Sequence, residues 1–210
     1  MPKVRIPKKN VTIDMTALTD VSFLLLTFFI LTAQFRPAEV VAVDTPSSRS
    51  NEEIKEDNIT LTVDSAGHVY MNLYFTRRIP TLDSMIERYG DKFPVLKTLT
   101  PAQIDNFANV ETFGFDINQL PSLLNNSVDA LKSLKSDQMS GIPSDTANNQ
   151  LGYWVNAARS TGLSTGTEIP LAIKGDKKTN VVAVKDVIET LRSREIYRFN
   201  LITTLESNID

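Results

Sequence analysis

The chain has 210 residues and a net charge of −3, with no cysteine and a single histidine, His68. A slightly acidic chain without a later basic stripe argues against a nucleic-acid partner. The missing cysteines exclude disulfides and cysteine metal sites, and one histidine excludes a histidine cluster. We expect His68 to be a solvated residue of a hairpin turn, and we expect no enzyme activity and no cofactor.

Residues 1–12 are polar and basic and contain two prolines, which predicts a short cytoplasmic tail. Residues 13–35, IDMTALTDVSFLLLTFFILTAQF, are strongly apolar and about long enough to cross a hydrocarbon core of about 30 Å. From Val21 to Ala33 there is no charge, and the hydroxyl side chains can bond to carbonyls of their own helix. This stretch predicts a transmembrane helix.

The basic residues near the N-terminus all precede this span, so the N-terminus is expected in the cytoplasm and everything after Arg36 outside. A secretory signal peptide is the first alternative. It is disfavoured because the apolar run continues into Gln34-Phe35-Arg36-Pro37 without a small-x-small cleavage site.

Asp20 lies within the span, where a carboxylate costs about 2.5 to 3.5 kcal/mol on insertion scales and therefore needs a partner or a purpose. Thr16, Asp20, Thr27 and Gln34 fall within roughly 40° on a helix and form a polar stripe, with Phe23 as its apolar exception. Desolvation favours the neutral acid, whereas a polar neighbour lets it ionise. We predict that Asp20 carries protons. The alternative is a carboxylate at the headgroup boundary, stabilised by the helix dipole.

The stretch resembles the membrane segment of the ExbD/TolR family, the smaller subunits of proton-driven motors that energise outer-membrane processes in Gram-negative bacteria. The family motif is Thr-Pro-x-x-Asp-Val, in which the Asp carries protons; Thr16, Asp20 and Val21 match it, and Ala17 replaces the Pro. The resemblance implies a homodimer inside a pentameric ring of an ExbB/TolQ-like multi-span protein of the inner membrane. It also implies protons as the coupling ion, a periplasmic C-terminal domain and a TonB-like or Tol-like client.

Residues 36–58 are rich in Ser, Glu, Asp and Pro and predict a periplasmic linker. Within it, Val41 and Val43 alternate with other residues before Pro46, as in an extended segment. The family carries a similar motif that can add to the edge of a periplasmic sheet, although Thr45 replaces its Leu. Val41, Val43 and Pro46 are therefore a candidate linker motif, and a solvated linker is the alternative.

Residues 59–210 predict a periplasmic α+β domain, a small sheet packed by helices. The predicted elements are a hairpin, then a strand, a helix and a last strand: 59–63 and 69–73, 169–173, 184–194, and 197–205. The family resemblance resumes over the hairpin, over Pro170 to Lys177 and from Val181 to Leu205.

Residues 79–167 depart from the family and predict a helical insertion. Thr100 before Pro101 is a helix start, and an apolar stripe follows from Leu120 to Leu134. Another helix is predicted from the spacing of Leu151, Trp154, Val155 and Ala158. The stripe either packs onto the sheet or docks an envelope partner, and we expect the domain to fold without residues 79–167.

The leading hypothesis is an inner-membrane proton-channel motor subunit that couples proton flow through Asp20 to mechanical work on periplasmic or outer-membrane partners. The alternative is a membrane-tethered periplasmic binding or scaffold protein without proton coupling. A tether has no need of Asp20.

Overall fold

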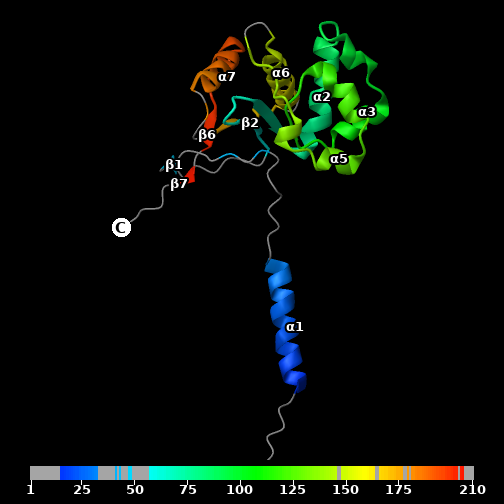
Figure 1. Ribbon diagram of the computed structural model, residues 1–210, viewed down its shortest axis with the longest axis vertical. Coiled ribbons are helices and arrows are strands. Elements are labelled where there is room, and N and C mark those ends of the chain that lie inside the picture. The colour runs from blue at the N-terminus through cyan, green and yellow to red at the C-terminus, as the bar shows by residue number, and fades with distance from the viewer. Residues whose placement is uncertain are drawn as a thin grey trace, which may run out of the picture. The chain divides into compact units, whose positions relative to one another are not determined.

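A computed structural model describes residues 15–32, 41, 43, 47–48, 57–145, 148–163, 166–176, 179, 181–202 and 204–205. The chain divides into two compact units, Met1–Ala38 and Glu39–Asp210. The first contains helix α1 (Met15–Thr32), which among the described residues is the one helix long and apolar enough to cross a membrane (Figure 1). Its 18 residues rise by about 27 Å. The other residues of the predicted span 13–35 lie outside the described part.

The second unit is built on a mixed sheet with the strand order β4-β3-β2-β5-β6. β2 lies in the middle, antiparallel to β3 and parallel to β5, and β6 extends the sheet parallel to β5. The strands are β2 (Ile59–Val63), β3 (Val69–Leu73), β4 (Thr112–Phe113), β5 (Leu171–Gly175) and β6 (Asn200–Ile202). Alternate residues of the central strands are apolar and buried, which gives the sheet one core face.

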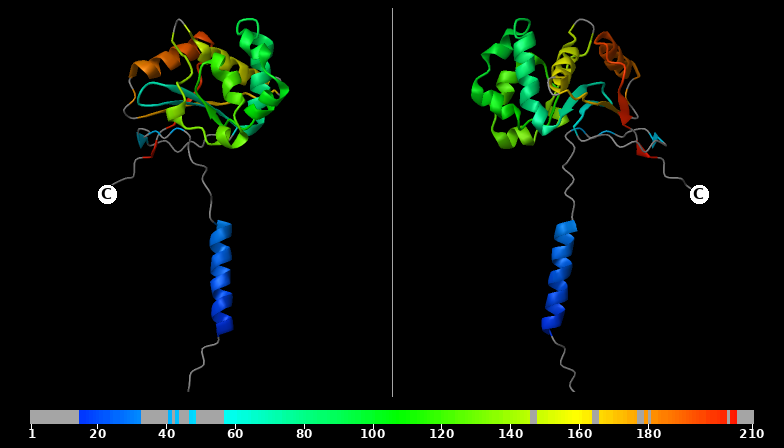
Figure 2. Two further views of the ribbon diagram at one scale, coloured as in Figure 1. Left: turned by 45° about the vertical axis from the view of Figure 1, so that its right-hand side comes forward. Right: turned by 180° about the vertical axis from the view of Figure 1, so that it is seen from behind.

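Helices α2, α6 and α7 lie over the same face of this sheet (Figure 2), α3 packs against α2, and α4 packs against α3. The helices are α2 (Arg78–Tyr89), α3 (Pro101–Phe107), α4 (Leu120–Leu124), α5 (Val128–Lys132), α6 (Gln150–Leu163) and α7 (Val181–Ser193). Short 3₁₀ turns connect them at Phe75–Arg77, Pro94–Thr98, Ile117–Gln119 and Ser136–Gln138. The predicted fold class, one apolar N-terminal helix and an α+β domain, is confirmed.

The predicted hairpin is confirmed residue for residue as β2 and β3. The next strand begins at Leu171 rather than Ile169, because Pro170 has no N–H for the ladder; its carbonyl still accepts a hydrogen bond from Ile59 N at 2.9 Å. Helix α7 begins at Val181, before the predicted start at Val184. The apolar pattern does not include Val181, because this residue is exposed and adds nothing to the apolar face.

The prediction of one continuous last strand, 197–205, is wrong. The backbone first completes the C-terminal turn of α7, and only β6, from Asn200 to Ile202, joins the sheet beside β5. A separate short strand, β7 (Thr204–Leu205), pairs in parallel with β1 (Ser47–Ser48) from the linker region.

The segment 79–167 is part of the domain core. Trp154 on α6 is 1 % exposed, and its ring lies 4.8 Å from the ring of Phe113 and 6.0 Å from that of Phe107. β4, which carries Phe113, pairs with β3 of the central hairpin. Removal of this segment would uncover the sheet face that α2 and α6 bury, which argues against the expectation that the domain folds without it.

The predicted apolar stripe from Leu120 to Leu134 divides into two short helices, α4 and α5. Ser127 separates them, and its side chain accepts a hydrogen bond from Ala130 N at 3.4 Å as the N-cap of α5. Leu120, Leu124 and Leu131 are buried, so the stripe packs inside the domain. The helix start at Thr100 is confirmed, with a capping box between Thr100 and Gln103.

Candidate functional site

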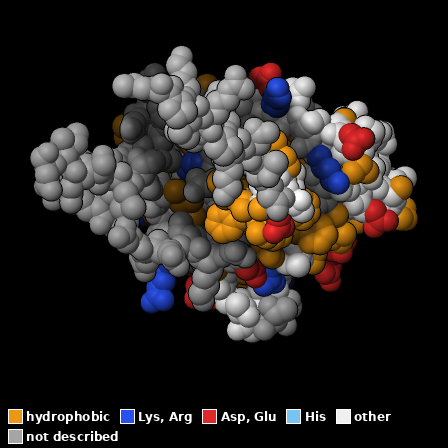
Figure 3. Space-filling model, turned by 90° about the horizontal axis from the view of Figure 1, so that it is seen from below, with side chains coloured by type: hydrophobic (Ala, Val, Ile, Leu, Met, Phe, Trp, Pro, Cys, Tyr) orange, Lys and Arg blue, Asp and Glu red, His pale blue; other side chains and the backbone are white. Residues whose placement is uncertain are grey.

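Helix α1 has none of its residues buried within its own unit. Its large apolar side chains are between 52 and 85 % exposed on all sides of the helix. Such a surface is costly in water and matches hydrocarbon. Figure 3 shows hydrophobic side chains next to one another in the view from below, with acidic and basic side chains around them.

The hydroxyl groups of α1 bond to carbonyls of the same helix. Ser22 Oγ donates to Leu18 O at 2.9 Å, Thr27 Oγ1 to Phe23 O at 2.9 Å, and Thr32 Oγ1 to Phe28 O at 2.7 Å. These bonds satisfy the polar groups that a hydrocarbon core would otherwise leave unpaired, as the sequence predicts.

Asp20 lies on α1 about 7.5 Å along the axis from Met15 and about 18 Å from Thr32. Its side chain is exposed, and no described residue makes a hydrogen bond or an ion pair with its carboxylate. Of the predicted polar stripe, Thr16 lies one turn before Asp20 and Thr27 almost two turns after it. Gln34 lies outside the described residues.

The linker is held to the second unit at the residues that the structure describes. Val41 is only 6 % exposed and belongs to the hydrophobic core of the domain, and the half-buried Val43 packs against that core. Four residues after Val43, β1 begins, and it pairs with β7. Pro46, the third residue of the candidate linker motif, lies outside the described residues.

An ion pair fixes the point where the linker joins the sheet. Arg77 Nη2 lies 2.7 Å from Asp57 Oδ2, and Arg77 Nε also donates to this carboxylate. The hydrogen bond to Asp57 raises the pKa of Arg77. Arg77 Nη1 donates in addition to the carbonyl of Thr161 on α6 at 3.2 Å. Sequence reasoning missed this clamp, because nothing marks two charges twenty positions apart as partners.

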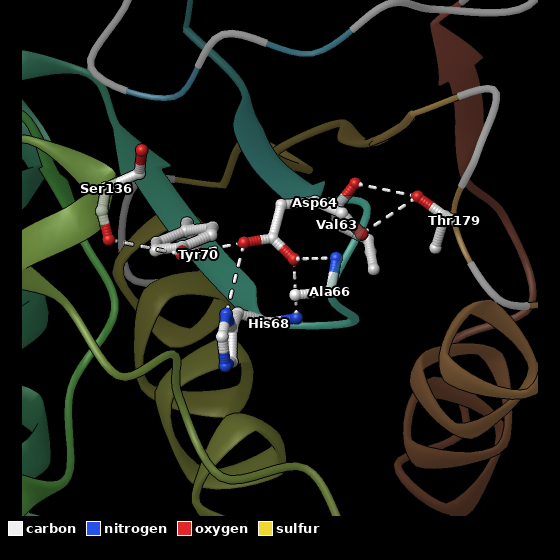
Figure 4. A network of polar contacts seen from close by, with 7 residues as sticks. All are labelled: Val63, Asp64, Ala66, His68, Tyr70, Ser136 and Thr179. Atoms are coloured by element: carbon white, nitrogen blue, oxygen red, sulfur yellow. Dashed lines mark hydrogen bonds and ion pairs between the residues drawn. The ribbon is translucent and has the colours of Figure 1, made fainter.

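The turn of the β2–β3 hairpin is organised by Asp64 (Figure 4). Asp64 Oδ1 accepts hydrogen bonds from the backbone N–H groups of Ala66 and His68, at 2.9 and 2.8 Å. Asp64 Oδ2 accepts the Tyr70 hydroxyl at 3.0 Å and lies 3.2 Å from His68 Nδ1. The sequence marked the turn itself but gave no sign of these side-chain partners.

Asp64 also joins the hairpin to the approach of α7, since the Thr179 hydroxyl donates to the carbonyls of Asp64 and Val63, at 2.9 and 3.3 Å (Figure 4). Burial raises the pKa of Asp64, but the hydrogen bonds from His68 and Tyr70 outweigh it and leave the pKa below its ordinary value. Burial and the neighbouring Asp64 raise the pKa of the Tyr70 phenol. The side chain of His68 is 48 % exposed, which confirms the predicted solvated turn residue.

This network stabilises the hairpin turn, because both carboxylate oxygens of Asp64 already have hydrogen-bond donors. Within the described part of the chain, no group of three or more His, Cys, Asp or Glu side chains is placed to hold a metal ion. The carboxylate of Asp20, by contrast, has no hydrogen-bond or ion-pair partner among the described residues.

The family model described as "Biopolymer transport protein ExbD/TolR" matches residues 7–206. The chain belongs to the ExbD/TolR family. The match covers α1 and almost all of the second unit, including the segment 79–167. No curated protein and no solved structure matches the chain.

Membership in the ExbD/TolR family gives the chain a part in biopolymer transport, and members of this family are non-enzymatic subunits of transport motors. Together, the family and the one candidate span indicate a single-pass membrane protein. Asp20, the proton carrier predicted from the sequence, lies on α1 in this ExbD/TolR chain, one turn after Thr16.

Proposed function

We propose that this protein is the smaller subunit of an inner-membrane proton-channel motor and that Asp20 carries the protons. Proton flow is coupled to mechanical work on periplasmic or outer-membrane partners, in energised transport or envelope maintenance. The observation that supports this proposal is a carboxylate without a partner among the described residues, on a helix whose apolar side chains all face outward.

The proton cycle follows from the cost of charge in hydrocarbon. A carboxyl surrounded by apolar groups binds a proton and releases it only where a polar group or water stabilises the anion. Thr27 cannot supply that group, because its hydroxyl is bonded to Phe23 O and it lies almost two turns away. Thr16, one turn before Asp20, is the in-chain candidate within reach. The principal stabilising group therefore comes from the partner.

The proposed assembly places the N-terminus in the cytoplasm and the α+β domain in the periplasm. Two copies of the chain sit inside a pentameric ring of an ExbB/TolQ-like multi-span protein, with protons as the coupling ion and no cofactor. The TonB-like or Tol-like client is on the periplasmic side. The Asp57–Arg77 clamp supports a role for the domain in force transfer, because it connects the end of the linker to α6 through Arg77.

The test compares Asp20→Asn with Asp14→Asn, which makes the same chemical change before the described start of α1. Each variant is co-expressed with its multi-span partner, purified as a complex and reconstituted in liposomes. Proton flux is followed with a pH-sensitive dye. We expect Asp20→Asn to abolish flux while the complex still assembles, and Asp14→Asn to retain flux.

Thr16→Val is expected to lower flux only modestly, because the hydroxyl assists the carboxylate without carrying the proton. Normal flux in Asp20→Asn, with normal insertion and assembly, would contradict the proposal and favour a simple membrane tether. Loss of flux in Thr16→Val with full flux in Asp20→Asn would equally exclude Asp20 as the carrier.

A further inference from the structure

Three helices of the second unit meet at a cluster of two cations and one phenol. Lys92 follows the C-terminal end of α2, Tyr153 lies in the first turns of α6, and Arg194 follows the last residue of α7. None of these residues belongs to the membrane helix, the linker or the Asp64 network of the hairpin turn. Lys92, Tyr153 and Arg194 together form a cationic cluster.

Both cations of the cluster lie against the same ring. Lys92 Nζ is 4.4 Å and the guanidinium carbon of Arg194 is 4.6 Å from the ring centroid of Tyr153. Lys92 Nζ also donates a hydrogen bond to the Tyr153 hydroxyl. Tyr89 and Phe93 meet the ring edge-on, at 4.9 and 5.5 Å between centroids, and hold it in place.

The cationic cluster has no negative counterpart within the described part of the chain. No described carboxylate forms an ion pair with Lys92 or Arg194, and Asp91, the neighbour of Lys92 in sequence, pairs with Lys97 at 2.6 Å instead. Arg194 Nε is buried and finds no acceptor among the described residues. The N-terminus of α6 adds positive partial charge, whereas the C-terminal ends of α2 and α7 carry negative partial charge that stabilises the two cations.

The backbone fixes Arg194 in this position. Glu195 has a positive φ of 60°, and the N–H groups of Glu195 and Ile196 donate to the carbonyls of Arg192 and Leu191, which is a Schellman ending of α7. On α6, Gly152 leaves room for the guanidinium: a Cβ at this position would lie 2.8 Å from Arg194 Nε. The two features together hold the guanidinium over Tyr153.

We propose that Lys92, Tyr153 and Arg194 form a binding site for the carboxylates of an acidic peptide segment on a partner protein. The guanidinium and the ammonium supply charge-assisted hydrogen bonds, and the phenol hydroxyl adds one more donor or acceptor. The half-exposed ring and the exposed Lys92 leave the site open to a chain that approaches from solvent.

The first backbone N–H groups of α6 are not free to bind a phosphate. Phosphate sites at helix N-termini use free backbone N–H groups. In α6 these groups are already occupied: Gln150 N and Leu151 N donate to Pro143 O, and Gly152 N donates to Asn149 Oδ1. The hydrogen bond from Lys92, with help from Arg194, also lowers the pKa of the Tyr153 phenol, so the cluster favours a negatively charged oxygen.

The test measures binding of a polyglutamate peptide to the full-length protein in uncharged detergent micelles by isothermal titration calorimetry. We expect saturable binding that weakens by about tenfold or more in Lys92→Gln and in Arg194→Gln, because each removes a charge-assisted contact. Gly152→Ala should weaken binding as well, since it displaces the guanidinium without changing the charge.

Lys132→Gln on α5 and Arg192→Gln on α7 are the matched controls, because both remove one exposed positive charge outside the cluster. They should bind polyglutamate like the wild type, and a polyglutamine peptide should not bind. Glutarate should displace the peptide more effectively than inorganic phosphate. Asp20→Asn should bind normally, so that this site and the proton-carrying role fail independently.

The proposal is overturned if polyglutamate does not bind, or if Lys92→Gln and Arg194→Gln bind like their controls. Lower thermal stability with unchanged affinity in these two variants would show that the cluster only fastens the three helices together. Stronger displacement by phosphate than by glutarate would overturn the assignment to carboxylates.

Discussion

Helices α1 and α6 are both rich in apolar residues, yet their surroundings are opposite. On α6, Trp154, Leu151 and Val155 are buried between the sheet and α2. On α1, the apolar side chains are exposed on every side, and the one charged residue of the described helix, Asp20, is exposed with them. The apolar surface of α6 thus packs within the protein, whereas the apolar surface of α1 matches a hydrocarbon environment.

The two helices also differ in whether their polar side chains have hydrogen-bond partners. Gln150, at the start of α6, is buried, but its Oε1 accepts a hydrogen bond from Ile117 N at 2.8 Å, so it serves the fold. Asp20 has no such bond to a described residue. A costly group without a structural partner points to a function.

The largest effect is expected from Trp154→Ala, which removes the centre of the α6 packing. It should lower the free energy of unfolding of the α+β domain by about 3 to 5 kcal/mol. Leu31→Ala on α1 is the control, because Leu31 is 85 % exposed. Denaturant titration of the full-length protein in micelles, followed by circular dichroism, compares the two. Equal losses in both variants would contradict the contrast between the helices.

A smaller effect is expected from Asp64→Asn at the hairpin turn. Loss of the ionised acceptor should cost about 1 to 2 kcal/mol of domain stability at neutral pH. The pKa of Asp64 is lowered in the folded state, so its contribution is complete above the unfolded value of about 3.9 and is lost as the pH falls through the folded value.

The measurement for this prediction is the free energy of unfolding as a function of pH for the wild type and Asp64→Asn. The difference between the two should shrink in acid, as the pH falls through the folded pKa of Asp64. Ser65→Ala, an exposed change in the same turn, is the control. A difference that grows as the pH falls would show that the assigned hydrogen bonds do not favour the ionised form.

The smallest effect is expected from Glu195→Gly. Glu195 is the one residue other than glycine with a positive φ in the described part of the chain, at the C′ position that glycine usually occupies. Glycine should stabilise the domain by up to about 1 kcal/mol by relieving this conformation. The thermal midpoint should rise slightly, and Glu189→Gly in the middle of α7 should lower it. A fall with Glu195→Gly would exclude the strain argument.

The sequence predicted the membrane helix, the hairpin and the β5–α7–β6 unit because their apolar residues recur with a clear period. It placed the start of β5 two residues early, since periodicity does not register the missing N–H of Pro170. It predicted one stripe from Leu120 to Leu134, since the spacing of leucines does not reveal that Ser127 caps a new helix. It also treated residues 79–167 as separable, because the pairing of β4 with β3 is long-range and too short to leave a pattern.

Of the candidate site, the sequence predicted Asp20 and the helix that carries it, because a carboxylate within an apolar run is visible without a structure. The Asp57–Arg77 clamp, the partners of Asp64 and the cationic cluster could not be predicted. Each joins residues from distant elements, and only the fold brings Lys92, Tyr153 and Arg194 against one another.

The most direct test of the central claim is to observe the proton on Asp20. The complex of this chain with its multi-span partner is reconstituted in lipid, and infrared spectra are recorded as the pH is changed. The signal of a protonated carboxyl is then compared between the wild type and Asp20→Asn. We expect a carboxyl band that titrates in the wild type and is missing from Asp20→Asn but present in Asp14→Asn. Identical spectra for the wild type and Asp20→Asn would show that Asp20 does not bind and release protons, and would contradict the account.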